Sequence, residues 1–144
     1  MKLFKYLLLI SMVLWSSSLV AQSFKLSDLK AKTWQVESGL EGLEFLDVYF
    51  SFQNTKHTIT IIAKDGSEED LDCLFDMYIS DSKQESFDYS KIGKSQSGKY
   101  IVCHNTYELL GETYENFNCY EIVTLTADKL ALKELDNTLT FKAR

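Results

Sequence analysis

Along most of the chain, apolar and polar residues alternate with a period of two, which is typical of β-strands that bury one face. In residues 45–52 the inward face is expected to carry Leu46, Val48, Phe50 and Phe52. Helical periodicity covers a single turn, at residues 26–30. The alternation predicts eight strands, at residues 33–37, 45–52, 57–63, 73–80, 99–105, 118–126, 129–135 and 138–142.

The predicted strands follow one another closely, and most of the breaks between them have the length of hairpin turns. This spacing favours an all-β, antiparallel, up-and-down sheet. Because a strand at the edge of a sheet exposes unpaired backbone groups, we expect the sheet to close into a β-barrel. An open two-sheet sandwich is the alternative. The interior of an eight-stranded barrel is just wide enough for packed side chains or for one small ligand.

The first residues have the three parts of a secretory signal peptide. Lys2 and Lys5 supply the positive charge, residues 6–15 are apolar, and residues 16–21 carry small side chains before Gln22. The apolar stretch is shorter than the roughly 20 residues that a membrane-spanning helix needs. We therefore expect a cleaved signal peptide at residues 1–21 and one domain at residues 22–144. The mature protein is expected to be periplasmic or secreted, without a membrane span.

The 144-residue chain is acidic, with 21 aspartates and glutamates, 15 lysines and arginines, and a net charge of −6. Cleavage of the signal peptide would make it more acidic, because that segment carries two lysines and no carboxylate. Arg144 is the only arginine. The phosphate contacts of a nucleic-acid-binding protein are therefore not expected.

Several strand and turn sequences resemble those of small bacterial lipocalin-like (calycin-type) exported domains. They are residues 32–36 (KTWQV), 49–52 (YFSF), 78–81 (YISD), 87–94 (FDYSKIGK), 97–102 (SGKYIV), 119–126 (CYEIVTLT), 128–130 (DKL) and 138–141 (TLTF). The resemblance implies a barrel in which Trp34 plugs one end. It also implies a basic side chain over the indole, for which Lys142 or Arg144 is the candidate. Lipocalins carry a glycine two residues before this tryptophan, where the present chain has Lys32.

Aromatic residues on the predicted strands suggest a ligand site inside the barrel, with apolar walls and phenol groups that could orient a ligand. The candidates are Trp34, Phe50, Phe52, Phe75, Tyr100 and Tyr120. The alternative is that these rings simply fill the barrel as its core. The first interpretation predicts reversible binding of a small apolar or amphipathic molecule.

The second interpretation, a solid barrel, predicts a protein-interaction module that contacts another exported protein through its loops. Two long loops are expected, at residues 80–96 and 104–117. The second loop is unusually apolar for a solvated segment, and it could also be a lid or a ninth strand. Its apolar residues are Tyr107, Leu109, Leu110, Tyr114 and Phe117.

Three cysteines, Cys73, Cys103 and Cys119, remain after signal cleavage. Cys103 and Cys119 flank a 15-residue excursion and are the candidate disulfide pair, and three free buried thiols are the alternative. Cys103 and His104 are adjacent on a strand and face opposite ways, so no metal site is expected from them. No nucleophile-and-base motif or phosphate loop is present, so neither enzymatic activity nor a cofactor is expected.

Overall fold

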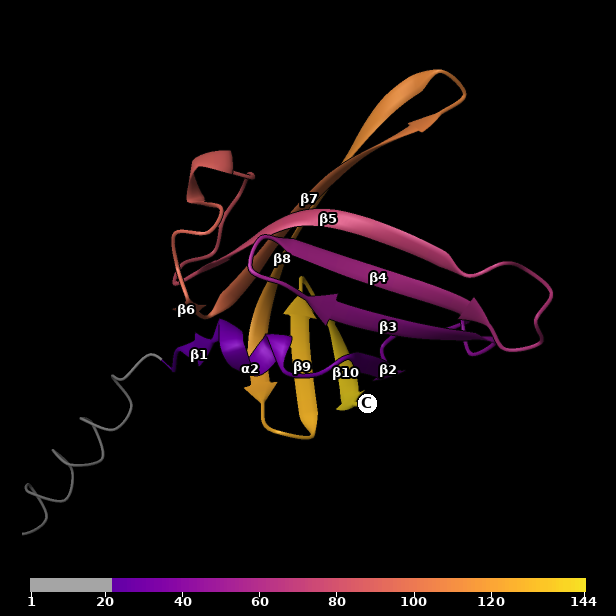
Figure 1. The fold of residues 1–144 in the computed structure, drawn as a ribbon, viewed down its shortest axis with the longest axis horizontal. Helices are drawn as coiled ribbons and strands as arrows, with labels where there is room; N and C mark the ends of the chain where they lie inside the picture. Colours follow the sequence, from indigo (N-terminus) through magenta and orange to yellow (C-terminus); the bar gives the residue numbers. More distant parts are fainter. Residues whose placement is uncertain (1–21) are drawn as a thin grey trace, which may run out of the picture.

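The computed structural model describes residues 22–144, and the predicted signal peptide at residues 1–21 lies outside the described residues. The described part of the chain is made mostly of β-strands, with one short α-helix near its start and one 3-10 helix at Tyr89–Lys91 (Figure 1). In order they are β1 (Phe24–Lys25), α2 (Leu26–Lys30), β2 (Trp34–Ser38), β3 (Leu46–Phe52), β4 (Lys56–Ala63), β5 (Leu71–Ser80), η1 (Tyr89–Lys91), β6 (Ser97–Gly98), β7 (Tyr100–Leu109), β8 (Glu112–Leu125), β9 (Lys129–Glu134) and β10 (Asn137–Ala143).

Eight of these strands form one closed antiparallel barrel, in the order β10-β2-β3-β4-β5-β7-β8-β9. Strand β10 closes the ring because it pairs with β9 on one side and with β2 on the other. The barrel predicted from the alternation is therefore confirmed, and the two-sheet sandwich is excluded. Strands β1 and β6 form a separate two-stranded sheet outside the barrel.

One end of the barrel is closed by the segment that precedes β2. Leu26 and Leu29 of α2 are fully buried against the barrel core. Trp34 is also fully buried, and its indole Nε1 donates a hydrogen bond to the carbonyl oxygen of Leu29 at 2.9 Å. This hydrogen bond satisfies the indole N–H, which would be costly to bury without a partner. The expected tryptophan plug is thus present at this closed end.

The opposite end of the barrel, called here the open end, carries the β2–β3, β4–β5, β7–β8 and β9–β10 connections (Figure 1). The interior differs in burial between the two ends. Toward the closed end the inward side chains of Phe50, Met77, Ile101 and Phe141 are almost completely buried. Toward the open end, the residues that the register places on the inward face are only half-buried. They are Leu46, Ile61, Cys73, Asn116 and Asn118.

The prediction of a loop at residues 104–117 is wrong. Strands β7 and β8 continue through it and pair without interruption up to Leu109 and Glu112. Leu110 and Gly111 form the two-residue turn between them, both with positive φ, as in the turn type that matches the twist of a hairpin. The resulting hairpin, residues 105–117, projects beyond the barrel and is called here the arm (Figure 1).

The loop expected at residues 80–96 is confirmed as a connection, and it covers the outer face of the barrel. The Phe87 ring stacks on the His104 imidazole at 5.3 Å between ring centres and packs against Tyr78 at 5.0 Å. The Tyr89 hydroxyl lies 3.0 Å from Nδ1 of His104, within hydrogen-bond distance. Within residues 22–144, no helix is long and apolar enough to cross a membrane.

Candidate functional site

A groove opens in the barrel wall where β2 and β3 move apart. These strands pair at only two positions, Trp34 with Phe50 and Gln35 with Tyr49. Beyond Gln35 the two strands separate, and residues 39–45 connect them at the open end. Within residues 22–144 the facing edges of the two strands have no ladder partner beyond this point. Leu46 N donates to the carbonyl oxygen of Leu43 in the connecting loop, and the remaining backbone groups of these edges can hydrogen-bond a bound molecule.

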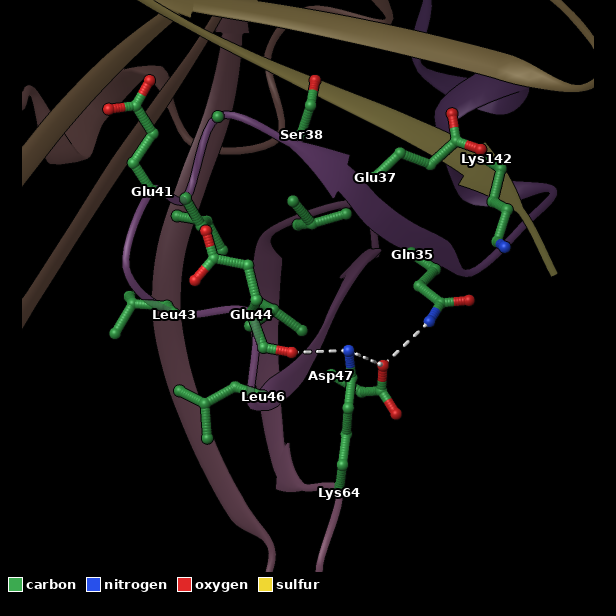
Figure 2. Close-up of a pocket in the computed structure, with 14 residues that line it drawn as sticks. Gln35, Glu37, Ser38, Glu41, Leu43, Glu44, Leu46, Asp47, Lys64 and Lys142 are labelled. Carbon is green, nitrogen blue, oxygen red and sulfur yellow. Dashed lines mark hydrogen bonds and ion pairs between the residues drawn. The ribbon is translucent and has the colours of Figure 1, made fainter.

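The groove has a volume of about 610 Å³, and its lining is amphipathic (Figure 2). This volume is within the roughly 300–1,000 Å³ that is usual for small-molecule sites. The apolar lining comes from inward positions of β2 and β3 and from the connecting loop. It consists of Val36, Leu40, Leu43, Leu46 and Val48. The polar lining consists of Gln35, Glu37, Ser38, Glu41, Glu44, Asp47, Lys64 and Lys142.

The loop at residues 39–45 depends on glycine. Gly39 has a φ of +102°, and a Cβ atom at this position would overlap the backbone carbonyl oxygen of Thr138 on β10. Any other residue would therefore both strain the backbone and clash. Gly42 has a φ of +80°, and its N–H donates to the Glu44 carboxylate at 3.2 Å. The backbone N–H groups of Glu44 and Gly42 lower the pKa of the Glu44 carboxyl below its usual value.

Ion pairs and hydrogen bonds fix the polar side of the groove. Gln35 Nε2 donates to the Asp47 carboxylate at 3.2 Å, and Lys64 Nζ lies 3.9 Å from the same carboxylate (Figure 2). Lys64 Nζ also donates to the carbonyl oxygen of Glu44 at 2.6 Å, so it ties the loop to β4. Among the described residues, Lys142 makes no ion pair, and its ammonium is available to a ligand.

A second hollow, of about 750 Å³, lies on the other side of the same loop and shares Leu40 and Leu43 with the groove. The β9–β10 turn, which includes Leu135, forms its other wall. The loop thus separates two concave surfaces at the open end, and its leucines contribute to both.

Most of the aromatic residues predicted to line a ligand cavity lie together inside the barrel. Trp34, Phe50, Phe52, Phe75 and Tyr120 are all buried. Phe50 connects the cluster, with ring centres 6.4 Å from Phe52 and 6.3 Å from Tyr120. These rings pack on one another as part of the hydrophobic core. This arrangement agrees with the alternative interpretation, in which the rings fill the barrel as its core.

Tyr100 does not join this cluster. The neighbouring Ile101 pairs with Ile79 and is fully buried in the core, so Tyr100 points to the outer face, where it is half-buried. The prediction that Tyr100 lines the interior is therefore wrong. The alternation in this strand would have given the same answer had the register been anchored on Ile101.

The disulfide expected between Cys103 and Cys119 is not formed, and the three cysteines are free. Cys103 pairs with Asn118 and is buried in the core, whereas Cys119 pairs with Val102 and faces the opposite side of the sheet. Thiols on opposite faces cannot meet. Burial raises the pKa of both thiols, Cys103 and Cys119, above the ordinary value.

His57 is the interior residue that sequence reasoning missed. It is 1% exposed, and its imidazole stacks on Phe52 at 4.6 Å and on Phe75 at 5.6 Å. Its Nδ1 lies 3.0 Å from the carbonyl oxygen of Ser51 and donates to it, whereas its buried Nε2 has no hydrogen-bond partner in the described part of the chain. Burial lowers the pKa of His57 to about 4, so the imidazole is neutral. Its shared parity with Ile59 and Ile61 was the available signal.

Comparisons with family models, with curated proteins and with solved structures found no match to this chain.

Proposed function

We propose that this protein is an exported, lipocalin-like barrel that reversibly binds a small amphipathic molecule in the groove between β2 and β3. The observation that supports the proposal is the early separation of these two strands. It creates a concave site in the barrel wall that is lined by both apolar side chains and hydrogen-bonding groups.

The groove fits this role better than the centre of the barrel. The aromatic cluster near the closed end is fully packed, so a ligand there would have to displace core side chains. In the groove a ligand would cover the half-exposed Leu46 and the exposed Leu43 without displacing a core side chain. Covering apolar surface in this way is favourable by about 25 cal/mol per Å².

The polar rim gives a reason to expect an amphipathic ligand rather than a purely apolar one. Asp47 and Glu37 are engaged by Lys64 and Lys129, the second at 2.9 Å. The Lys142 ammonium, by contrast, makes no ion pair within residues 22–144. A ligand with an aliphatic or aromatic body and one polar head group could therefore use both the leucines and the rim.

The test is a titration of the purified protein with an environment-sensitive apolar dye, followed by displacement with amphipathic competitors. Leu43 and Leu74 are both exposed leucines, but only Leu43 lines the groove. We expect Leu43→Asp to weaken dye binding at least about tenfold and Leu74→Asp to leave it unchanged. Equal effects of the two variants, or no saturable signal in the native protein, would overturn the proposed site.

The proposal also includes export. Fractionation of the cells that produce the full chain, with sequencing of the N-terminus of the mature form, tests this part separately. An N-terminus near Gln22 in the exported fraction supports it. Uncleaved protein that remains in the cytoplasm contradicts it.

A further inference from the structure

Within residues 22–144, neither edge of the arm pairs with a further strand. Strand β5 pairs with β7 only as far as the pair of Asp76 with His104, and β9 pairs with β8 only from Glu121 onward. The arm between these points is a two-stranded ribbon that projects away from the barrel (Figure 1). A free strand edge of this kind is a template for pairing with another extended segment.

The hydrogen-bond phase of the ribbon identifies which backbone groups are free. Ile122 N donates to the carbonyl oxygen of Lys99, so this pair is a hydrogen-bonded one. Hydrogen-bonded and non-hydrogen-bonded pairs alternate in an antiparallel ladder. In the arm, the backbone N–H and C=O groups of Thr113, Glu115 and Phe117 on β8 therefore point away from β7.

The edge on β8 is the better of the two edges for a partner. On β7, the side-chain amide of Asn105 donates to the carbonyl oxygen of Leu74, so the base of this edge is held close to β5. The corresponding tie on β8, from Asn118 to the Glu134 carboxylate of β9 at 3.1 Å, lies outside residues 113–117. The outward groups on β8 extend over a longer stretch that begins directly after the turn. A partner strand can therefore pair with residues 113–117 without meeting the barrel wall.

The two faces of the arm differ in chemistry. On one face, Tyr107 and Tyr114 stack at 5.4 Å between ring centres with an interplanar angle of 20°. The other face carries Glu108 and Glu115 among threonines, and Glu115 is largely exposed. Within residues 105–117 there are three glutamates and no basic residue. One face thus offers an aromatic surface. The other carries two glutamates, of which Glu115 is largely exposed and lies 3.9 Å from Nε2 of His104 at the base of the arm.

The turn adds a further observation. Leu110 is 96% exposed and has a φ of +54°, a conformation that leucine adopts at a cost. An exposed, strained leucine at the tip of an arm stabilises neither the turn nor the core. Contact with a partner gives a reason for an apolar residue at this position.

We propose that the β8 edge of the arm binds an extended peptide segment of another protein in which basic and apolar residues alternate. The segment adds a strand beside residues 113–117. Its lysines or arginines lie on the face of Glu108 and Glu115, and its apolar side chains lie on the face of the stacked tyrosines. A second copy of the arm fits less well, because it would bring its own three glutamates against the same edge.

The test uses a short synthetic peptide of alternating lysine and valine, titrated into the purified protein. The controls are a glutamate–valine peptide and a peptide of the same composition with its lysines and valines in two blocks. We expect saturable binding of the alternating basic peptide only, weaker at high ionic strength. Hydrogen exchange is expected to slow at the amides of Thr113, Glu115 and Phe117.

Two variants separate edge pairing from charge attraction. Thr113→Pro removes an outward N–H without changing the charge and leaves the β7–β8 ladder intact, and Thr113→Val is its matched control. The double substitution Glu108→Lys with Glu115→Lys keeps the edge and reverses the charge. Both Thr113→Pro and the double variant should weaken binding about tenfold or more. Retained contacts between the Tyr107 and Tyr114 rings in NMR spectra show that the arm is still folded.

Several results would overturn the inference. These are no saturable binding of the basic peptide, equal binding of the block peptide, or binding that is unchanged in Thr113→Pro with an intact arm. Self-association of the native protein through the arm, abolished by Thr113→Pro, would assign the edge to a second copy instead. None of these outcomes bears on the groove, which lies between different strands and is tested by dye binding.

Discussion

His57 should make the stability of this barrel depend on pH in a defined window. The imidazole lies between Phe52 and Phe75 and is 1% exposed, and its Nε2 has no hydrogen-bond partner among residues 22–144. Protonation would place an uncompensated charge in this apolar cage. Burial is the main cause that lowers the pKa of His57 from 6.5 to about 4, and the hydrogen bond to Ser51 opposes it only in part.

The magnitude follows from linkage. Because the folded-state pKa of His57 is lower than the unfolded-state pKa, the unfolded chain binds more protons between these values. Stability from the neutral imidazole is therefore fully present above pH 6.5 and is lost as the pH falls toward about 4. At about 1.4 kcal/mol per pKa unit, the loss across this window amounts to about 3 kcal/mol.

The perturbation is His57→Leu, which is close in volume and has no titratable group. The free energy of unfolding is measured by urea denaturation at a series of pH values from neutral to about pH 4 for the native protein and the variant. Subtraction cancels the carboxylates, whose protonation also destabilises the fold in acid. The quantity compared is the free energy of unfolding of the native protein minus that of His57→Leu. We expect this difference to be constant above pH 6.5 and to fall by about 3 kcal/mol at about pH 4.

Phe75→Leu is the matched control, because it also truncates a ring of this cage but introduces no titration. Its difference curve against the native protein should be flat over the same pH range. A flat curve for His57→Leu would show that the imidazole is solvated or relaxes on protonation. A curve of the opposite sign would show that His57 is charged in the folded state.

Three further predictions concern the loop, the thiols and the turn. Gly39→Ala should lower the free energy of unfolding by about 2 kcal/mol or more, because alanine would strain the backbone and overlap Thr138. Gly42→Ala has open space for a Cβ and should cost only the backbone strain, so equal losses of stability in chemical denaturation would contradict the prediction. Alkylation without reductant, followed by mass spectrometry, should show modified Cys73 and Cys119 in the folded protein and modified Cys103 only after unfolding. Two cysteines that stay unmodified after unfolding because a disulfide joins them would contradict this prediction. Leu110→Asn should slow hydrogen exchange in the arm by about fivefold or more, because asparagine adopts the left-handed conformation at a cost lower by roughly 1 kcal/mol. Faster exchange in this variant would be inconsistent with backbone strain at Leu110.

The barrel could be predicted because its signal is local. In β3, the alternation of Val48, Phe50 and Phe52 with polar residues records directly which face is buried, and the short breaks leave few ways to connect the strands. Burial of Trp34 at the closed end follows from the same alternation and agrees with the plug that the lipocalin resemblance implied.

The groove and the arm could not be predicted because both depend on where pairing between neighbouring strands stops. The alternation in residues 33–38 and 45–52 continues past Gln35 and Tyr49, although the two strands have already separated. Residues 104–117 conversely carry many polar and acidic residues on both faces, so their pairing leaves little trace in the hydrophobic pattern. The disulfide prediction failed for a similar reason. Cys103 pairs with Asn118 and not with Cys119, and this offset of one residue places the two thiols on opposite faces of the sheet.

The two proposed sites follow from a difference between the two ends of the barrel. At the closed end, β2 and β3 are paired at Trp34 and Phe50, and the helix α2 with Trp34 covers the opening. At the open end, the ladder stops early between β2 and β3, and it ends again where the arm leaves β5 and β9. Unpaired backbone groups therefore occur at two separate places of different shape. The first is a concave groove between two separated strands, which suits a small molecule, and the second is a straight free edge, which suits an added strand.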